Sequence, residues 1–244
     1  MNWKYSIIIV SLLAMLVISL MLNYIFYKKA FIPLQAAKLD PIGLNYYKQD
    51  IAKDKKSDKP IVMFYGDSRG LSWPNPSLDQ YQFINRSIGN QTSIQTVARF
   101  NQHVSPHRPK TIIIQVCVND LKMIPLFPDK AKQIVADCKA NLKKLLIQAQ
   151  AIESKVILST VFPLGEVTLE RRILGIKAQP IMNAIDNVNI YIRSLASRNV
   201  AIFDSYQLLK GKGQKIDKQY SHDWLHLNKK GYQHLNKHLL ELLQ

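Results

Sequence analysis

The sequence predicts a three-layer α/β domain preceded by an N-terminal transmembrane helix. From Pro60 onward, short apolar runs alternate with longer segments whose apolar residues recur at helical spacing. Strands that alternate with helices indicate right-handed crossovers and a parallel sheet covered on both faces. The run at 111–118 is uncharged and rich in β-branched residues, which is typical of a buried central strand. An uncharged stretch near the start of the chain predicts the membrane-spanning helix.

Residues 1–29 are expected to form an uncleaved signal anchor that crosses the membrane once. Residues 7–27 carry no charge, and lysines flank them on both sides. At about 1.5 Å per residue, this length crosses the ~30 Å core of a bilayer. A cleaved signal peptide, whose apolar region is shorter, and a buried soluble helix are the alternatives. The positive-inside rule hardly separates the two orientations, because the positive charges on the two sides of the span nearly balance. We nevertheless expect the following domain on the extracytoplasmic side.

Residues 30–59 are expected to form a juxtamembrane linker, because they contain two prolines and a lysine-rich stretch without clear periodicity. The α/β domain then occupies residues 60–244. Its strands are predicted at 61–65, 82–88, 111–118, 155–161 and 200–204. Its helices are predicted at 92–104, 129–151, 176–197 and 228–243.

The composition excludes a disordered chain and argues against nucleic-acid binding. Apolar residues make up 47% of the chain and charged residues 20%. The formal charge of +16 would suit a nucleic-acid partner, but the lysines are scattered and no helix-turn-helix, zinc-finger or RRM-type signature is present. A domain tethered beside anionic lipid headgroups explains the basic surplus at least as well.

Cys117 and Cys138 are the only cysteines. Cys117 ends an apolar run and Cys138 lies in a helical pattern, so two buried thiols are expected, with a disulfide as the alternative outside the cytoplasm. The two cysteines lack Cys-x-x-Cys spacing, which argues against a zinc site. His234 and His238 are spaced like metal ligands on a helix, but no third ligand is evident, so no metal is expected.

Ser68 lies between Gly66 and Gly70, directly after the first predicted strand. The pattern Gly-x-Ser-x-Gly fits either a plain tight turn or a nucleophile elbow that exposes a serine oxygen. Gly89 and Asn119 follow the second and third strands. All three positions should therefore meet at the carboxyl edge of the parallel sheet, where ligands bind in such folds.

Near the C-terminus, Asp223 and His226 lie three residues apart before the last predicted helix. This spacing lets the carboxylate reach one imidazole nitrogen while the other faces outward, as a serine nucleophile requires of its base. The order Ser, Asp, His also fits the α/β-hydrolases. In that fold, however, the acid and the histidine come from separate loops and several strands precede the nucleophile, so this fold is disfavoured.

The motifs resemble, in order, the conserved blocks of the SGNH (GDSL-type) hydrolases over essentially the whole domain. YGDSRG is similar to the block that carries the nucleophile, here Ser68, and DWLHLN to the block that carries the acid and base, Asp223 and His226. NRSIGNQTS and QVCVNDL are similar to two further blocks. The resemblance implies an oxyanion hole made by the backbone N–H groups of Ser68 and Gly89 and the Asn119 amide. It also implies a flavodoxin-like sheet of about five parallel strands and no metal or organic cofactor.

Two residues depart from the family pattern and are candidate substrate-binding residues. Arg69 replaces the usual leucine beside the nucleophile, and we expect it either to bind an anionic group of the substrate or to point to solvent. Cys117 replaces a glycine in the third block, where a larger side chain would narrow the acyl pocket or displace Asn119.

The resemblance implies a hydrolase that cleaves carboxylic esters through an acyl-serine intermediate, and the uncharged span at residues 7–27 implies that this hydrolase is anchored in a membrane. Its substrate would be a small-molecule or lipid ester, an aryl ester or a thioester. The alternative is an O-acetylesterase or acetyltransferase acting on cell-envelope polysaccharide. A third hypothesis, a non-catalytic glycan-binding module, is disfavoured because no member of the Ser-His-Asp triad is missing.

Overall fold

The computed structural model describes residues 3–47 and 57–243, and the chain divides into two compact units. The first unit, Met1–Pro41, contains helix α1 (Trp3–Leu39), which buries no side chain and is long and apolar enough to span a membrane. Residues 30–39, which the sequence assigns to the linker, continue this helix with Pro33 inside it. Residues 48–56 of the predicted linker lie outside the described residues.

The second unit, Ile42–Gln244, begins earlier than the domain start predicted at residue 60. The Tyr47 hydroxyl donates a hydrogen bond to the Ser87 carbonyl (2.6 Å), and the Gln91 amide donates to the Ile42 carbonyl (2.6 Å). These bonds hold the 42–47 segment against the loop that follows the second strand. That part of the predicted linker is therefore packed on the domain.

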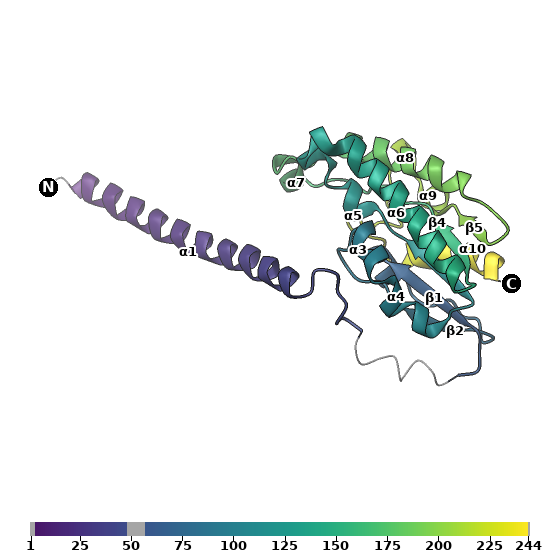
Figure 1. The fold of residues 1–244 in the computed structure, drawn as a ribbon. Coiled ribbons are helices and arrows are strands. Elements are labelled where there is room, and N and C mark those ends of the chain that lie inside the picture. The colour runs from purple at the N-terminus through teal and green to yellow at the C-terminus, as the bar shows by residue number, and fades with distance from the viewer. Residues whose placement is uncertain (1–2, 48–56, 244) are drawn as a thin grey trace. The chain divides into compact units, whose positions relative to one another are not determined.

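Five parallel strands form one sheet in the order β2-β1-β3-β4-β5, the flavodoxin-like arrangement (Figure 1). The strands are β1 (Ile61–Gly66), β2 (Gln82–Asn85), β3 (Thr111–Gln115), β4 (Lys155–Ser159) and β5 (Val200–Phe203). All five predicted strands are present, each close to its predicted range. β3 ends before the predicted limit of 118, because Cys117 takes a left-handed backbone conformation and Val118 begins a short helix.

The long helices lie where the helical spacing predicts them: α6 (Ala131–Ala151), α8 (Ala178–Ser194) and α10 (Lys229–Leu243). The predicted helix at 92–104 is divided at Arg99 into α3 (Ser93–Ala98) and α4 (Phe100–His103). Shorter helices are α2 (Ser68–Leu71), α5 (Val118–Leu121), α7 (Leu169–Ile173) and α9 (Ser205–Leu209). Single 3₁₀ turns occur at η1 (Ser105–His107), η2 (Ile124–Leu126), η3 (Pro128–Lys130) and η4 (Lys212–Gln214).

The sheet separates two apolar cores, which confirms the three-layer prediction. Along β1, Met63 and Tyr65 pack into the core that contains α6 and α8, whereas Val62 and Phe64 pack into the core that contains α10. This alternation follows from the two-residue period of a strand. Because the strands are parallel, their carboxyl ends share one edge, and the segments after β1, β2 and β3 meet there.

Candidate active site

Ser68 begins helix α2 directly after β1, in a turn that leaves no room for a side chain at Gly66. A Cβ atom on Gly66 would lie 1.8 Å from the Gln115 carbonyl oxygen of neighbouring β3. Asp67 is fully buried and caps α2, since its Oδ1 accepts the Arg69 backbone N–H (2.9 Å). Burial raises the pKa of Asp67 to about 7. Asp67 thus shapes the turn, and Ser68 next to it remains partly accessible.

The structure places His226 within hydrogen-bonding distance of both Ser68 and Asp223. Ser68 Oγ lies 3.0 Å from His226 Nε2, and His226 Nδ1 lies 2.8 Å from Asp223 Oδ2. A neutral imidazole with its proton on Nδ1 donates to the carboxylate and accepts from the serine hydroxyl. The three residues that the sequence predicts as a triad therefore meet across 158 positions of the chain.

The 223–226 turn is organised by its own carboxylate. Asp223 Oδ1 accepts the backbone N–H groups of Leu225 and His226, both at 2.7 Å, while Oδ2 faces the imidazole. Burial alone would raise the pKa of Asp223, but the hydrogen bonds from the His226 ring and from these two N–H groups together lower it to about 2. The carboxylate is therefore ionised at any pH at which a histidine can act as a base.

The loop after β2 lies against the serine, as the sequence predicts. A Cβ atom on Gly89 would lie 4.0 Å from Ser68 Cβ, and the Ile88 N–H donates to the Gly66 carbonyl (3.0 Å). The Asn119 side chain is 2% exposed and donates to the Gln91 carbonyl (2.9 Å). Gly89 and Asn119 are thus placed at the same sheet edge, and their role as oxyanion donors remains a prediction.

A family model described as GDSL-like lipase/acylhydrolase matches residues 58–234. The chain belongs to this family. No curated protein matches the chain.

Solved structures share the fold of this GDSL-type protein at low sequence identity. A candidate acylhydrolase from Bacteroides fragilis is 24% identical, with a TM-score of 0.69 over 84% of this chain and 97% of its own. A GDSL-like lipase from Bacteroides thetaiotaomicron is 22% identical, with a TM-score of 0.64 over 83% and 99%. An acetylxylan esterase from Geobacillus stearothermophilus is 17% identical, with a TM-score of 0.57 over 77% and 95%.

Arg69 is not placed to contact a substrate or solvent, so both expectations for it are wrong. The side chain is fully buried, and its Nε donates to the Leu225 carbonyl at 2.7 Å. Its two terminal nitrogens donate to the Phe162 and Pro163 carbonyls at 3.1 and 3.2 Å. Arg69 therefore links α2, the helix that begins at Ser68, to the turn that carries Asp223 and His226.

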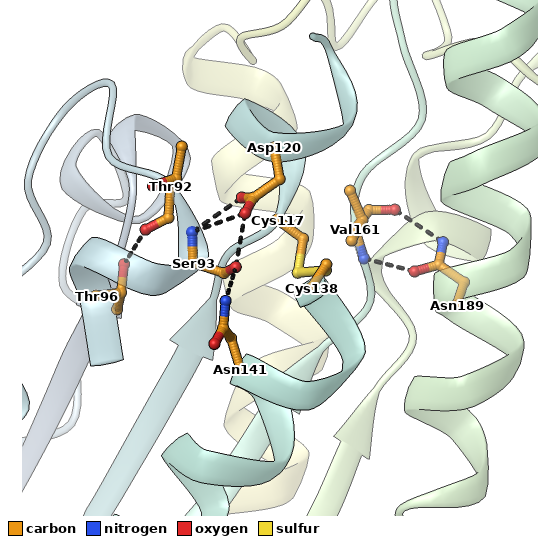
Figure 2. The surroundings of a disulfide bond; sticks show 9 residues. All are labelled: Thr92, Ser93, Thr96, Cys117, Asp120, Cys138, Asn141, Val161 and Asn189. Carbon is orange, nitrogen blue, oxygen red and sulfur yellow. Dashed lines mark hydrogen bonds between the residues drawn. A yellow bond between two sulfur atoms is a disulfide. The ribbon is translucent and has the colours of Figure 1, made fainter. Parts of the chain in front are cut away.

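Cys117 is likewise not a substrate-binding residue. It forms a disulfide with Cys138, and both cysteines are fully buried (Figure 2). The expectation of two free thiols is therefore wrong, and so is that of a Cys117 side chain lining the acyl pocket. The bond forms because α6 passes beside the loop after β3. This arrangement arises from tertiary packing, so the local sequence pattern does not reveal it.

A second buried arginine, Arg99, supports the other side of the site and has no counterpart in the sequence-based prediction. Its guanidinium donates to the Gly66 carbonyl (2.9 Å) and to the Arg86 carbonyl (2.6 Å). The end of β1 and the loop after β2 are thereby joined. The sequence shows only an arginine in the middle of an amphipathic segment, and an arginine in such a segment ordinarily faces solvent, so the pattern does not indicate that Arg99 is buried.

Among residues 3–47 and 57–243, no group of three or more histidine, cysteine or acidic side chains is arranged to hold a metal ion. His234 stacks on Tyr220, with ring centroids 4.9 Å apart, and His238 pairs with Glu241. The His234 and His238 spacing noted in the sequence thus serves contacts within and beside α10.

Proposed function

We propose that the chain is a membrane-anchored serine hydrolase that cleaves carboxylic esters through an acyl-serine intermediate. The observation that carries the proposal is the continuous contact from Ser68 Oγ to His226 Nε2 (3.0 Å) and from His226 Nδ1 to Asp223 Oδ2 (2.8 Å). A serine hydroxyl becomes nucleophilic when a base accepts its proton, and a carboxylate orients that base. Membership of a lipase/acylhydrolase family supports the same chemistry.

In the proposed reaction, His226 accepts the Ser68 proton as Oγ attacks the ester carbonyl carbon. The negative charge on the tetrahedral oxygen would be stabilised by the N–H groups of Ser68 and Gly89 and by the Asn119 amide. His226 then donates its proton to the departing alcohol. Water, deprotonated by His226, attacks the acyl-serine and releases the acid, which restores the free hydroxyl. Asp223, whose pKa is about 2, stays ionised and stabilises the imidazolium in both steps.

The anchor and its orientation form part of the proposal. Helix α1 is long and apolar enough to span a membrane, and none of its side chains is buried by the protein. The Cys117–Cys138 disulfide supports an extracytoplasmic domain, because disulfides persist in oxidising compartments and are rare in the cytosol. We place the hydrolase domain on the outer face of the membrane that holds α1.

Lipid, aryl and thio-esters are the leading substrate class, and acetyl groups on envelope polysaccharide are the second candidate. The observation that favours the second is the accessibility of the site: the His226 and Asp223 side chains are 34% and 41% exposed. A triad whose side chains are partly exposed admits a bulky polymer that carries a small acyl group. The shared fold with an acetylxylan esterase motivates the same test, and acetyl transfer to a glycan hydroxyl would use the same acyl-enzyme.

The proposal is tested with the full-length chain in detergent against p-nitrophenyl esters of increasing acyl length and against acetylated xylan and peptidoglycan. Wild type should release product from at least one class, and Ser68→Ala should release none. Preference for acyl chains longer than butyrate would select the lipid ester class, whereas release of acetate from glycan alone would select the second candidate. A wild-type protein inactive on every ester would overturn the proposed function.

A further inference from the structure

The disulfide joins the loop after β3 to the first half of α6, next to the residue proposed to stabilise the oxyanion. Cys117 is the residue immediately before α5, and Asn119 is the second residue of that four-residue helix. The Cys117 carbonyl accepts the N–H groups of Asp120 (3.1 Å) and Leu121 (3.0 Å), so the only turn of α5 begins on this cysteine. The position of the Asn119 amide therefore depends on the backbone of Cys117.

Cys117 has a backbone conformation that an ordinary side chain disfavours. Its φ is 87° and its ψ is −21°, in the left-handed region that glycine occupies freely and that a residue with a Cβ atom disfavours for steric reasons. The side chain is fully buried, so no solvent contact compensates for this conformation. A covalent bond to Cys138 supplies a restraint that keeps a residue other than glycine in place.

Polar contacts converge on the same short helix from α3 and α6 (Figure 2). The Asp120 carboxylate accepts the Ser93 N–H (2.9 Å) and the Ser93 hydroxyl (2.6 Å). Asn141, one turn beyond Cys138 on α6, donates to Ser93 Oγ (3.0 Å). One face of α6 thus holds the α5 turn twice, covalently through Cys138 and by hydrogen bonds through Asn141, Ser93 and Asp120.

A disulfide that only stabilises the fold could join any two packed elements. This one is attached to the residue from which the Asn119 helix starts, and it restrains the backbone torsion that sets the direction of that helix. Loss of such a bond should therefore affect the chemical step more than substrate binding, because an oxyanion donor acts in the transition state.

We propose that the Cys117–Cys138 disulfide is a positioning element of the active site: it holds the left-handed turn at Cys117 and thereby aims the Asn119 amide at the oxyanion. The inference rests on the proposed function of Asn119. Its consequence is that kcat depends on the oxidation state of this cysteine pair, so that the enzyme reaches full activity only where the disulfide can form.

The test compares two disulfide-free forms of the full-length chain that differ by one methyl group at residue 117 and therefore in the backbone freedom of that residue. Cys117→Ala/Cys138→Ala removes the bond and leaves a Cβ at the left-handed position, whereas Cys117→Gly/Cys138→Ala removes the bond and the backbone penalty together. We expect kcat for p-nitrophenyl acetate to fall about tenfold in the alanine pair, with KM within about twofold of wild type. The glycine pair should recover kcat to within about twofold of wild type.

Thermal unfolding and labelling by a fluorophosphonate show whether each variant is folded and retains an activated serine. A stabilising role alone predicts that both pairs lose thermal stability and keep the wild-type kcat. Wild-type kcat in the alanine pair, or equal loss in the alanine and glycine pairs, would overturn the proposal. If the alanine pair does not fold, the wild-type protein is reduced stepwise, and kcat is measured against the number of free thiols. A kcat that stays constant as thiols appear would overturn the proposal. A wild type that neither labels nor turns over ester would instead contradict the proposed function.

Discussion

Replacing Arg69 by leucine, the residue usual beside the nucleophile in this family, should strongly destabilise this protein. The side chain is fully buried, and its guanidinium donates to the carbonyls of Leu225, Phe162 and Pro163. A hydrogen bond to a charged group contributes about 1.5–3 kcal/mol, and a buried acceptor left without a donor costs about 1–3 kcal/mol. Part of this loss is offset, because the substitution removes the desolvation cost of a buried charge and places an apolar side chain in the core. We expect a decrease of about 3–5 kcal/mol in the free energy of unfolding.

Urea unfolding of the full-length chain in detergent, followed by tryptophan fluorescence, measures this loss. Trp73 is 2% exposed and lies 5.9 Å from the Phe162 ring, over which the Arg69 guanidinium stacks. With a slope near 2 kcal/mol per M, the midpoint should fall by about 1.5–2.5 M. Arg69→Lys keeps the positive charge but loses the planar guanidinium that donates to several carbonyls, so its unfolding midpoint should lie between those of wild type and Arg69→Leu.

The exposed Arg198 provides the matched control, and Arg198→Leu should stay within about 0.5 kcal/mol of wild type. Turnover should also fall in Arg69→Leu, because the Leu225 carbonyl belongs to the turn that carries Asp223 and His226. An Arg69→Leu protein with the wild-type midpoint and a raised KM for anionic esters would refute the reasoning and restore Arg69 as a substrate contact.

Three further predictions concern the buried Asp67, the proposed oxyanion donor Asn119 and the proposed membrane anchor α1. Because burial raises the pKa of Asp67 to about 7, the folded chain retains a proton between about pH 4 and 7 that the unfolded chain has released, so stability should fall as pH rises through this window. The free energy of unfolding in urea, measured from pH 5 to 8, should depend less on pH in Asp67→Asn than in wild type. Parallel curves for the two proteins would contradict the raised pKa of Asp67. Asn119→Ala should lower kcat by about 10²–10³ while fluorophosphonate labelling persists more slowly, with Asn183→Ala on the exposed side of α8 as the unaffected control. The full-length chain should stay in the membrane fraction through high-salt washing and leave it only in detergent, and recovery in the soluble fraction with an unchanged N-terminal sequence would count against α1 as an anchor.

Much of the sheet and the meeting of Ser68, His226 and Asp223 could be predicted from the sequence, because both depend on local pattern and general topology. Apolar runs of strand length located β1 to β5, and parallel strands bring the residues after β1, β2 and β3 to one edge. The three-residue spacing of Asp223 and His226 is a local feature of one turn, so their contact follows from the sequence directly.

The supporting residues could not be predicted, because their partners are distant in sequence. Arg69 and Arg99 read as polar residues in exposed turns or helix faces, yet each is buried against backbone carbonyls that only the folded chain brings together. The Cys117–Cys138 bond spans 21 residues and depends on how α6 packs beside the loop after β3. Residues 42–47 gave no periodic signal, because they pack as an irregular segment through the contacts of Tyr47 and Ile42.

The proposed activated serine is tested most directly by treating the full-length chain with a fluorophosphonate and mapping the modified residue by mass spectrometry. Wild type should take up one label, on Ser68, because His226 lies 3.0 Å from its hydroxyl and is itself held by Asp223 at 2.8 Å. Ser68→Ala should take up none, and His226→Ala should label far more slowly, whereas the exposed-site control Ser197→Ala should label as wild type does. A label on any other residue, or labelling at the wild-type rate in His226→Ala, would contradict the account of this site.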